Sequence, residues 1–210
     1  MIVVGISGKM GSGKTTLSNA LAAEIVPSFQ VRFAGPLYEC HEAVWSILEG
    51  YGLPREQKSR DFLTWLGTEF VRNRQPDFWV KALNKKVREI RSATCLQDEP
   101  LVIVDDVRFE NEFLGLSGAL MVRLECPVDV RRARASAWSD AKHASEIGLD
   151  EYSRDGRFDL YFDTSTRSVE SMVSIIKRAI HLKDFDFIGK DDRESAKQIS
   201  AEHYVRAAEF

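Results

Sequence analysis

The stretch GKMGSGKT at residues 8–15 follows a short apolar run at residues 2–6 and precedes a helix-like segment at residues 17–25. Its spacing matches the phosphate-binding loop Gly-x-x-x-x-Gly-Lys-Ser/Thr, in the order of strand, loop and helix that this loop requires. The alternative is a glycine-rich turn that fits by chance, and the flanking segments make it the weaker one. The stretch therefore predicts binding of a nucleoside triphosphate, although motors, switches and kinases all share this loop.

The residue types in this loop explain how it would hold phosphate. Glycines adopt positive φ angles and carry no Cβ, so consecutive backbone N–H groups can face an anion at the start of a helix. Lys14 brings a mobile positive charge to the outer phosphates, and the Thr15 hydroxyl is a suitable ligand for Mg²⁺. We expect ATP to bind through the loop residues Gly8, Gly11, Ser12, Gly13, Lys14, Thr15 and Thr16.

Composition places the chain among globular proteins. Its 210 residues are 44% hydrophobic and 29% charged, which suits one domain with a buried core. The net charge of -3 gives no general attraction to nucleic acid, so no stable nucleic-acid partner is expected. The apolar runs are too short for a membrane span or a signal peptide, which favours a cytoplasmic protein. Cys40, Cys95 and Cys126 are widely spaced and predict reduced thiols.

Short apolar segments alternate with helix-like segments along the chain. The predicted strands cover residues 2–7, 29–33, 101–104, 120–124 and 160–162. The predicted helices cover residues 17–25, 37–49, 55–74, 79–90, 110–116 and 169–180, with a further helix after Pro127. This order predicts an α/β fold with a mainly parallel sheet. The helices between residues 55 and 90 are interpreted as an insertion over the sheet, and residues 139–157 as a mobile polar loop.

The stretch DDVRFENE at residues 105–112 begins where the apolar strand from Leu101 ends. Ligands bind at the carboxyl ends of strands in open α/β sheets, so we expect these acids near the phosphate loop. Since side chains alternate along a strand, Asp105 and Asp106 should point in different directions. One would hold Mg²⁺ through water or orient the acceptor, and Arg108 would grip a second phosphate. The alternative is that Asp105 caps a turn and Arg108 is a solvated charge.

The stretch RRARASAWSDAKHASE, which begins at Arg131, combines a basic helix face with a polar segment. Phosphoryl transfer spreads negative charge over the transferred group and requires that water be kept out. Arg131, Arg132 and Arg134 on a closing lid would meet both needs, and an ordinary solvated face is the alternative. His143 and Glu146 are too few for a metal site, so we expect hydrogen-bonded lid contacts from them.

Arginine and aromatic residues gather in the predicted insertion, where Arg72 and Arg74 lie among Trp65, Phe70 and Trp79. A nucleotide needs a stacking surface for its base and a bidentate partner for its phosphate, and these residue types supply both. Aromatic residues at helical spacing are also typical of a core, which is the alternative. Arg72 is the strongest candidate in this group.

Five motifs, in this order along the chain, resemble those of the bacteriophage-type deoxynucleoside monophosphate kinases. They are GKMGSGKT from Gly8, FAGPL from Phe33, LGTEFVRNRQPDFWV from Leu66, DVRFENE from Asp106 and HASE from His143. The resemblance extends from residue 1 to about residue 182. It implies a P-loop nucleoside monophosphate kinase-like fold with a five-stranded, mainly parallel sheet, a helical acceptor-binding insertion at about 37–92 and a lid at about 131–157. It also implies ATP and Mg²⁺ as cosubstrates and a deoxynucleoside monophosphate as phosphoryl acceptor.

The residue patterns and the resemblance together predict the members of the site. The expected catalytic residues are Lys14, Asp106, Arg108, Arg131 and Arg132. The expected magnesium ligands are Thr15 and, through water, Asp105. The acceptor is expected to contact Phe33, Trp65, Arg72, Arg74, Trp79, Asp106, Arg108, Arg134, His143 and Glu146.

The chain departs from the family pattern in three positions. Glu110 and Ala144 stand where such enzymes often carry proline, and Asp105 stands where they carry serine or threonine. These changes affect loop geometry more than reaction type. Residues 183–210 lie outside the resemblance, and neither their role nor the accepted base is predicted, while a homodimer is left open. The alternatives are a kinase for a nucleoside, a cofactor precursor or a modified base in DNA, and a P-loop switch.

Overall fold

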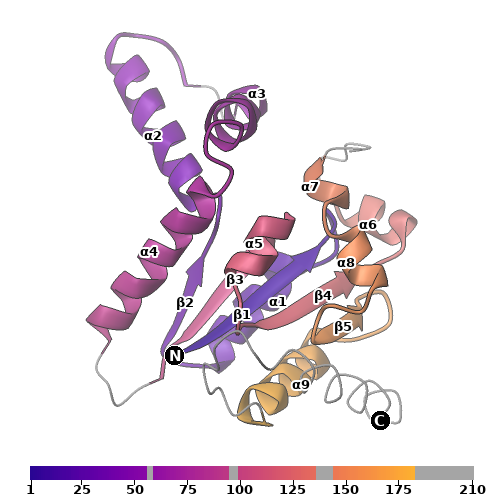
Figure 1. Cartoon of the computed structure of the whole chain (residues 1–210). Helices are drawn as coiled ribbons and strands as arrows, with labels where there is room; N and C mark the ends of the chain where they lie inside the picture. The colour runs from indigo at the N-terminus through magenta and orange to yellow at the C-terminus, as the bar shows by residue number, and fades with distance from the viewer. Residues whose placement is uncertain (56–58, 95–98, 136–143, 183–210) are drawn as a thin grey trace.

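A five-stranded parallel sheet forms the centre of the protein (Figure 1). The computed structural model describes residues 1–55, 59–94, 99–135 and 144–182. The strands are β1 (Ile2–Gly8), β2 (Ser28–Val31), β3 (Leu101–Val107), β4 (Leu120–Glu125) and β5 (Leu160–Asp163). They lie in the order β2-β3-β1-β4-β5, and every neighbouring pair is parallel. The predicted fold class is confirmed.

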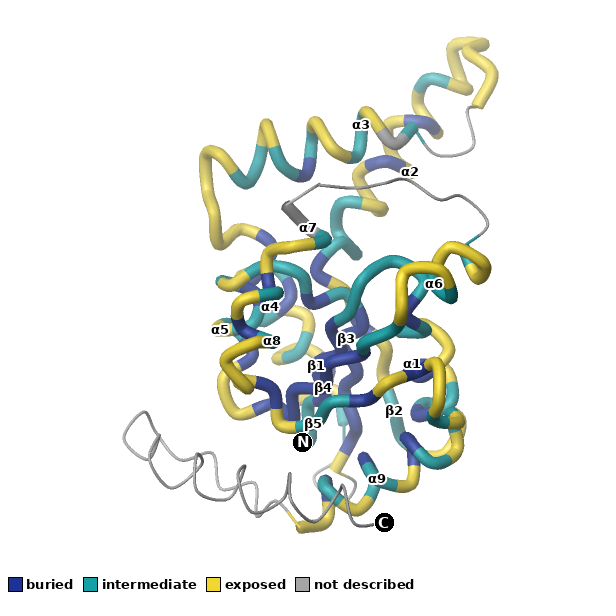
Figure 2. The backbone as a smooth tube through the Cα atoms, turned by 90° about the vertical axis from the view of Figure 1, so that its right-hand side faces the viewer, coloured by how far each residue is buried: buried dark blue, intermediate teal, exposed yellow. Residues whose placement is uncertain are grey.

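The central strands are apolar on both sides because helices cover both faces of the sheet. In β3, Val102 and Val104 pack into one apolar layer, while Leu101 and Ile103 pack into the other. None of these four side chains is exposed to solvent, and Figure 2 shows the central strands as buried. Strands buried on both faces have continuous apolar runs, which is why the sequence signal was clear at this strand.

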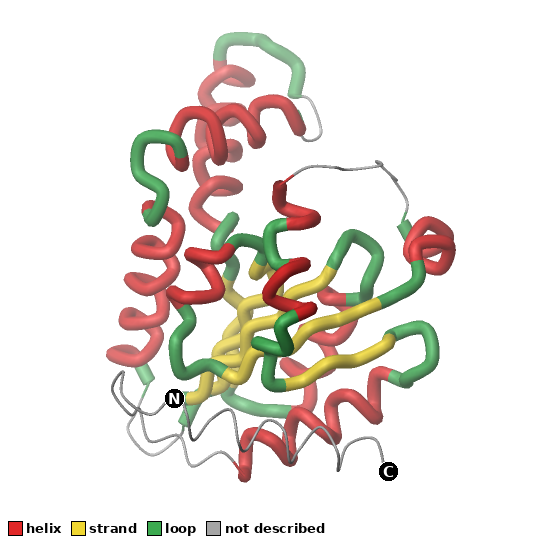
Figure 3. Tube along the Cα trace, turned by 45° about the vertical axis from the view of Figure 1, so that its right-hand side comes forward, coloured by secondary structure: helices red, strands yellow, loops and turns green. Residues whose placement is uncertain are grey.

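Helices from different parts of the chain cover the two faces of the sheet (Figure 3). On one face α1 (Lys14–Glu24) and α9 (Val169–Leu182) pack against the sheet. On the other face lie α4 (Phe78–Ala93), α5 (Glu110–Gly115) and α8 (Asp150–Arg154). No helix among the described residues combines the length and the apolar character that crossing a bilayer requires. The tail at residues 183–210 lies outside the described residues.

The helical insertion rises beyond the carboxyl ends of the strands, and its last helix, α4, returns along the sheet beside β2 (Figure 1). It contains α2 (Gly35–Gly50), α3 (Arg60–Thr64), η1 (Trp65–Arg72) and α4. The sequence predicted one helix over residues 55–74, and the structure instead has a short α-helix that continues directly into the π-helix η1. Ser59 marks the start of α3, because its Oγ accepts a hydrogen bond from the Phe62 N–H at 3.3 Å.

On the opposite side of the strand ends lie α6 (Val128–Arg134), α7 (Ala144–Ile147) and α8. The prediction of a loop over residues 139–157 is wrong for α7 and α8. Leu149 and Tyr152 are buried, and the Tyr152 hydroxyl donates to Glu110 Oε1 at 2.5 Å. Two apolar residues three apart fix this short helix to the core but are too few to produce a periodic pattern. Residues 136–143 lie outside the described residues.

Candidate active site

The phosphate loop joins the end of β1 to the start of α1, as its sequence predicted. Gly11 and Gly13 have φ angles of 76° and 92°, in the left-handed region that favours glycine. At Gly11 a side chain would also meet the backbone, because a Cβ would lie 2.6 Å from the Arg131 carbonyl oxygen. The loop therefore requires glycine both for its own conformation and for the close approach of α6.

Lys14 is held inside the loop. Its Nζ donates to the carbonyl oxygens of Gly8 at 2.6 Å and Lys9 at 3.0 Å. Burial lowers its pKa from 10.5 to about 8, and the nearby positive charge of Arg108 acts in the same direction. Anions in the loop would favour the protonated ammonium, so the site is suited to a bound phosphate chain.

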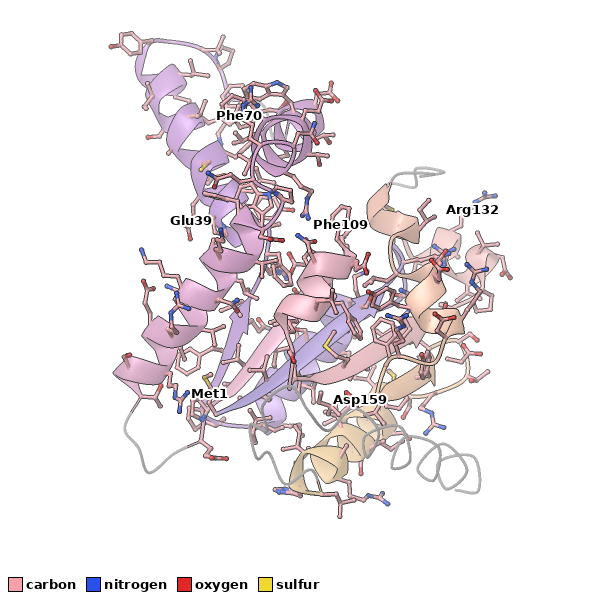
Figure 4. All side chains as sticks on the ribbon, viewed as in Figure 1. Met1, Glu39, Phe70, Phe109, Arg132 and Asp159 are labelled. Atoms are coloured by element: carbon pink, nitrogen blue, oxygen red, sulfur yellow. The ribbon has the colours of Figure 1, made fainter. Side chains whose placement is uncertain are left out.

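A cavity of about 490 Å³ lies next to the loop, which is within the range of ligand pockets. Its wall is built from the phosphate loop and the start of α1, the turns after β2 and β3, the end of β3, and the helices α2, α3, η1, α4, α5 and α7. Figure 4 shows Phe109, one of its lining residues, between the insertion and the ends of the strands. The predicted site residues that line this cavity are Lys14, Thr15, Phe33, Arg72, Trp79, Asp105, Asp106, Arg108 and Glu146.

Asp105 and Asp106 take different partners, as the alternation along β3 predicted. Both Asp105 oxygens accept hydrogen bonds from Arg32, at 2.8 and 2.9 Å. Both Asp106 oxygens accept backbone N–H groups, from Phe33 and Ala34, each at 2.9 Å. Burial raises the pKa of Asp106, and these two backbone donors oppose the shift. Asp106 thus fixes the turn from β2 to α2 and sets Phe33 in the cavity wall.

Arg72 reaches from η1 to the start of α5. One guanidinium nitrogen donates to Glu112 Oε1 at 2.8 Å, another to Asn111 Oδ1 at 3.3 Å, and the group lies 3.9 Å from the centre of the Phe109 ring. Glu112 is buried and also accepts the backbone N–H groups of Arg108 and Phe109, which caps α5. Burial raises the pKa of Glu112, while these donors and Arg72 favour its charged form. Arg72 is therefore anchored at the cavity by a buried carboxylate.

Glu146 connects the phosphate loop to Arg108. Its Oε2 accepts the Met10 N–H at 2.8 Å, and its Oε1 accepts from Arg108 at 3.2 Å. Its side chain is only 9% exposed. A neighbouring acid, Asp150, accepts from Lys9 Nζ at 2.7 Å and from the buried Arg123 at 3.0 Å. The segment from α7 to α8 is thus attached to the loop by two carboxylates.

Trp65 and Arg74 do not lie at the cavity, which corrects their expected role as acceptor ligands. Trp65 is 46% exposed and packs on the rings of Phe62 and Phe70. The Arg74 guanidinium lies 4.1 Å from the centre of the Phe70 ring and donates to the Phe70 carbonyl oxygen. The physical reason is that both residues take part in an aromatic and cationic cluster on the outer side of η1.

The predicted lid arginines point to three different places. Arg131 donates to the carbonyl oxygens of Cys126 at 3.1 Å and Met10 at 3.2 Å, so it contacts the phosphate loop. Arg134 donates to Thr164 Oγ1 at 3.1 Å, beyond the end of β5, and does not line the cavity, which corrects its expected role as an acceptor ligand. Arg132 is exposed on α6, on the side away from the insertion in Figure 4. His143 lies outside the described residues.

The donor atoms near the loop suit a magnesium ion that is held mainly by its substrate. Among the described residues no group of three or more His, Cys, Asp or Glu side chains could hold a metal ion. Thr15 lines the cavity and offers a hydroxyl, and Asp105 would act only through water, since Arg32 pairs with both of its oxygens. Mg²⁺ usually keeps several waters and binds substrate phosphates, so these residues fit it. Their magnesium roles stay a prediction.

Sequence reasoning missed several residues of the cavity. Arg32 carried a signal, because a charge at the carboxyl end of a predicted strand faces the ligand side of the sheet. Glu112 lay inside a motif but was assigned no role. Tyr38, Leu63 and Thr68 line the cavity from the insertion, and nothing in the sequence pattern distinguishes them from other helical residues.

Comparisons with known proteins agree on the fold. No family model matches the sequence, and no curated protein matches it either. A tunicamycin resistance protein from Deinococcus radiodurans has a TM-score of 0.52 and 16% identity, over 85% of this chain and 95% of that one. TT1252 from Thermus thermophilus has a TM-score of 0.51 and 21% identity, over 86% and 96%. Shikimate kinase from Acinetobacter baumannii, in complex with shikimate, has a TM-score of 0.51 and 12% identity, over 86% and 93%.

At these identities the likeness shows the fold and nothing further. The chain shares the α/β fold of these structures. In this chain the phosphate loop follows β1 and the insertion lies beside β2.

Proposed function

We propose that this protein transfers the γ-phosphoryl group of ATP to a deoxynucleoside monophosphate. Lys14 and Thr15 of the phosphate loop line the same cavity as Arg72 of the insertion. Aromatic side chains, Phe33 and Phe109, lie in the same wall. A site for two nucleotides needs cations for two phosphate groups and an apolar surface for a base, and this cavity offers both.

The choice of acceptor rests on the hydrogen bonds that the carboxylates of the cavity wall already make. Four line the cavity, and each has hydrogen bonds to both of its oxygens. They are Asp105, Asp106, Glu112 and Glu146. A hydroxyl acceptor needs a base to take its proton, and in each of these four carboxylates both oxygens already accept hydrogen bonds from the protein. A phosphate monoester is already ionised near pH 7, with a second pKa of about 6, so it needs no base.

The reaction then depends on positioning and charge. An oxygen of the acceptor phosphate attacks the γ-phosphorus, the bond from that phosphorus to the bridging oxygen breaks, and ADP leaves with the electron pair. Lys14 stabilises the transferred group from the loop, while Arg108 faces it from the end of β3. Arg72 holds the acceptor phosphate in line. Mg²⁺, when bound, neutralises charge on the β- and γ-phosphates.

The test is a coupled assay of ADP release with ATP, Mg²⁺ and a panel of acceptors. The panel pairs each deoxynucleoside monophosphate with its unphosphorylated nucleoside and adds shikimate. We expect at least one monophosphate to turn over at about 1–100 s⁻¹, as kinases do, and its nucleoside to remain inert. Turnover of nucleosides or shikimate alone would contradict the proposal, as would ATP binding without turnover of any monophosphate.

A second prediction concerns Glu146, whose carboxylate accepts a hydrogen bond from the Met10 N–H of the phosphate loop. Glu146→Gln keeps the shape of the side chain and removes its negative charge. Because that charge opposes the approach of the triphosphate, we expect Kd for a non-hydrolysable ATP analogue to fall by about tenfold, or about 1.4 kcal/mol. Since Arg108 loses its ion pair, kcat should fall at the same time. Calorimetry and steady-state assays measure the two effects.

Glu151→Gln is the matched control for this variant, because Glu151 is an exposed acid on α8 and does not line the cavity. It removes the same charge from the protein, so a general electrostatic effect would appear in both variants. Unchanged ATP affinity in Glu146→Gln, or an equal change in the control, would show that Glu146 does not compete with the triphosphate.

A further inference from the structure

We propose that Trp79 and the π-helical turn of η1 are positioning elements for Arg72, an inference that rests on the proposed function of that arginine. Trp79 belongs to α4, and its indole N–H donates to the Gly67 carbonyl oxygen of η1 at 3.0 Å. The sequence suggested Trp79 as a stacking surface for a base. Its indole N–H instead donates to the backbone of η1, the helix that carries Arg72.

The π-helix decides the direction of Arg72. Each residue of an α-helix turns the chain by about 100°, so one extra residue in a turn redirects every later side chain by that amount. η1 ends in a π-type hydrogen bond from the Asn73 N–H to the Thr68 carbonyl oxygen at 3.1 Å. In this register Gly67, Thr68 and Arg72 all line the cavity. In an α-helical register Arg72 would leave it.

Two neighbouring helices hold η1 in this conformation. Trp79 is 4% exposed and fastens it to α4. Gly67 is buried against α2, and a Cβ there would lie 2.9 Å from Leu37 Cδ2. Contacts from α4 and α2 therefore hold the backbone of η1 in its π-helical conformation. Such segments are rare in proteins and occur often at functional sites.

The side chain of Arg72 is fixed from a third direction, by α5. It contacts Glu112, Asn111 and Phe109. Its Nε is buried and has no hydrogen-bond partner among the described residues. A buried donor without a partner costs stability, so folding alone does not account for this placement. Holding a guanidinium at the cavity does account for it.

Trp79→Phe tests the hydrogen bond, because it keeps an aromatic ring and removes the N–H. We expect KM for the acceptor to rise at least tenfold, with Kd for ATP within twofold of wild type. Trp45→Phe is the matched control. Trp45 is also buried and its indole also donates, to His41 Nε2 at 3.0 Å, but it does not line the cavity. An equal rise of KM in the control, or no rise in Trp79→Phe, would overturn the inference.

Deletion of Glu69 tests the register, because it removes one exposed residue from η1 and allows an α-helix to form. We expect acceptor turnover to be lost in the deletion and kept in Glu69→Ala, which loses the same side chain without a change of register. Crystal structures of both variants would show whether Arg72 still contacts Glu112 and Phe109. These contacts should be absent in the deletion alone, and their survival there would overturn the inference.

The two proposals fail separately. A wild-type protein that phosphorylates no monophosphate contradicts the proposed function, while the position of Arg72 in the two crystal structures still decides the inference. If the wild-type protein is active and neither Trp79→Phe nor the deletion of Glu69 changes its acceptor kinetics, the inference alone is contradicted.

Discussion

Replacing Lys14 by Met is expected to lower kcat by about a thousandfold, the loss that follows removal of a donor aimed at developing charge. In the proposed reaction Lys14 stabilises the transferred group, and its Nζ is held inside the phosphate loop by the carbonyl oxygens of Gly8 and Lys9. A methionine fills similar space without charge. Single-turnover measurements with saturating ATP would separate this chemical loss from weaker binding.

The same variant should be more stable than wild type at neutral pH. The pKa of Lys14 is lowered from 10.5 to about 8, so below pH 8 the folded state carries the cost of a buried cation. This cost is relieved as pH rises from about 8 to 10.5, because the folded state loses the proton first. The shift corresponds to roughly 3 kcal/mol, and the two hydrogen bonds offset part of it. We expect the free energy of unfolding to rise by about 1–3 kcal/mol at pH 7.

Urea unfolding at pH 7 and above pH 10.5 checks this sign, since the stability difference should disappear at the higher pH. Lys9→Met is the matched control, because Lys9 lies in the same loop but pairs with Asp150 outside the cavity wall. We expect it to change kcat by about threefold at most, within the modest effects of surface charges. A Lys14→Met protein that keeps its rate would show that the loop does not act on the transferred phosphoryl group.

The sheet could be predicted from the sequence because its strands are buried on both faces. Residues 101–104 are a continuous apolar run, and they form the first half of β3. The strand continues to Val107, because Asp105 and Asp106 find partners on the turn that follows β2. In a sequence pattern, residues as polar as these two indicate the end of a strand. In this sheet the strand continues, because the turn after the neighbouring strand supplies a cation and two backbone N–H groups.

The charge pairs of the cavity could not be predicted, because they depend on strand order and on the path of the insertion. Arg32 and Asp105 are far apart in sequence and adjacent only because β2 pairs with β3. Arg72 meets Glu112 only because η1 lies over the start of α5. Periodicity could not show the π-helix either, since an apolar stripe at helical spacing carries no information about one extra residue in a turn.

Taken together, these pairs explain how the fold tolerates four cations in the wall of one cavity. Three of the cations, Arg32, Arg72 and Arg108, each have a carboxylate partner, and Lys14 is satisfied by loop carbonyls. The carboxylates orient the guanidinium groups before substrate arrives, which reduces the entropy lost on binding. The same arrangement engages both oxygens of each carboxylate in the cavity wall, which supports the proposal of an acceptor that is already ionised.

Replacing Arg72 by Lys is expected to lower kcat/KM for the acceptor by about a hundredfold, with the affinity for ATP unchanged. Lysine keeps the positive charge beside the buried Glu112, so the carboxylate is not left unpaired and the fold survives. It loses the planar fork that can bind a phosphate through two hydrogen bonds, and it loses the stacking on Phe109. Steady-state kinetics with each substrate varied in turn would measure the two affinities.

Arg74→Lys decides between the residue pattern and the structure. Both arginines belong to the same motif, but Arg74 stacks on Phe70 outside the cavity. The structure therefore predicts wild-type acceptor kinetics for Arg74→Lys, whereas the sequence alone placed both arginines on the acceptor. Equal losses in the two variants would mean that η1 turns Arg74 toward the substrate when the acceptor binds. A loss confined to Arg72→Lys would assign the acceptor phosphate to the arginine that α5 and the π-helix hold in place.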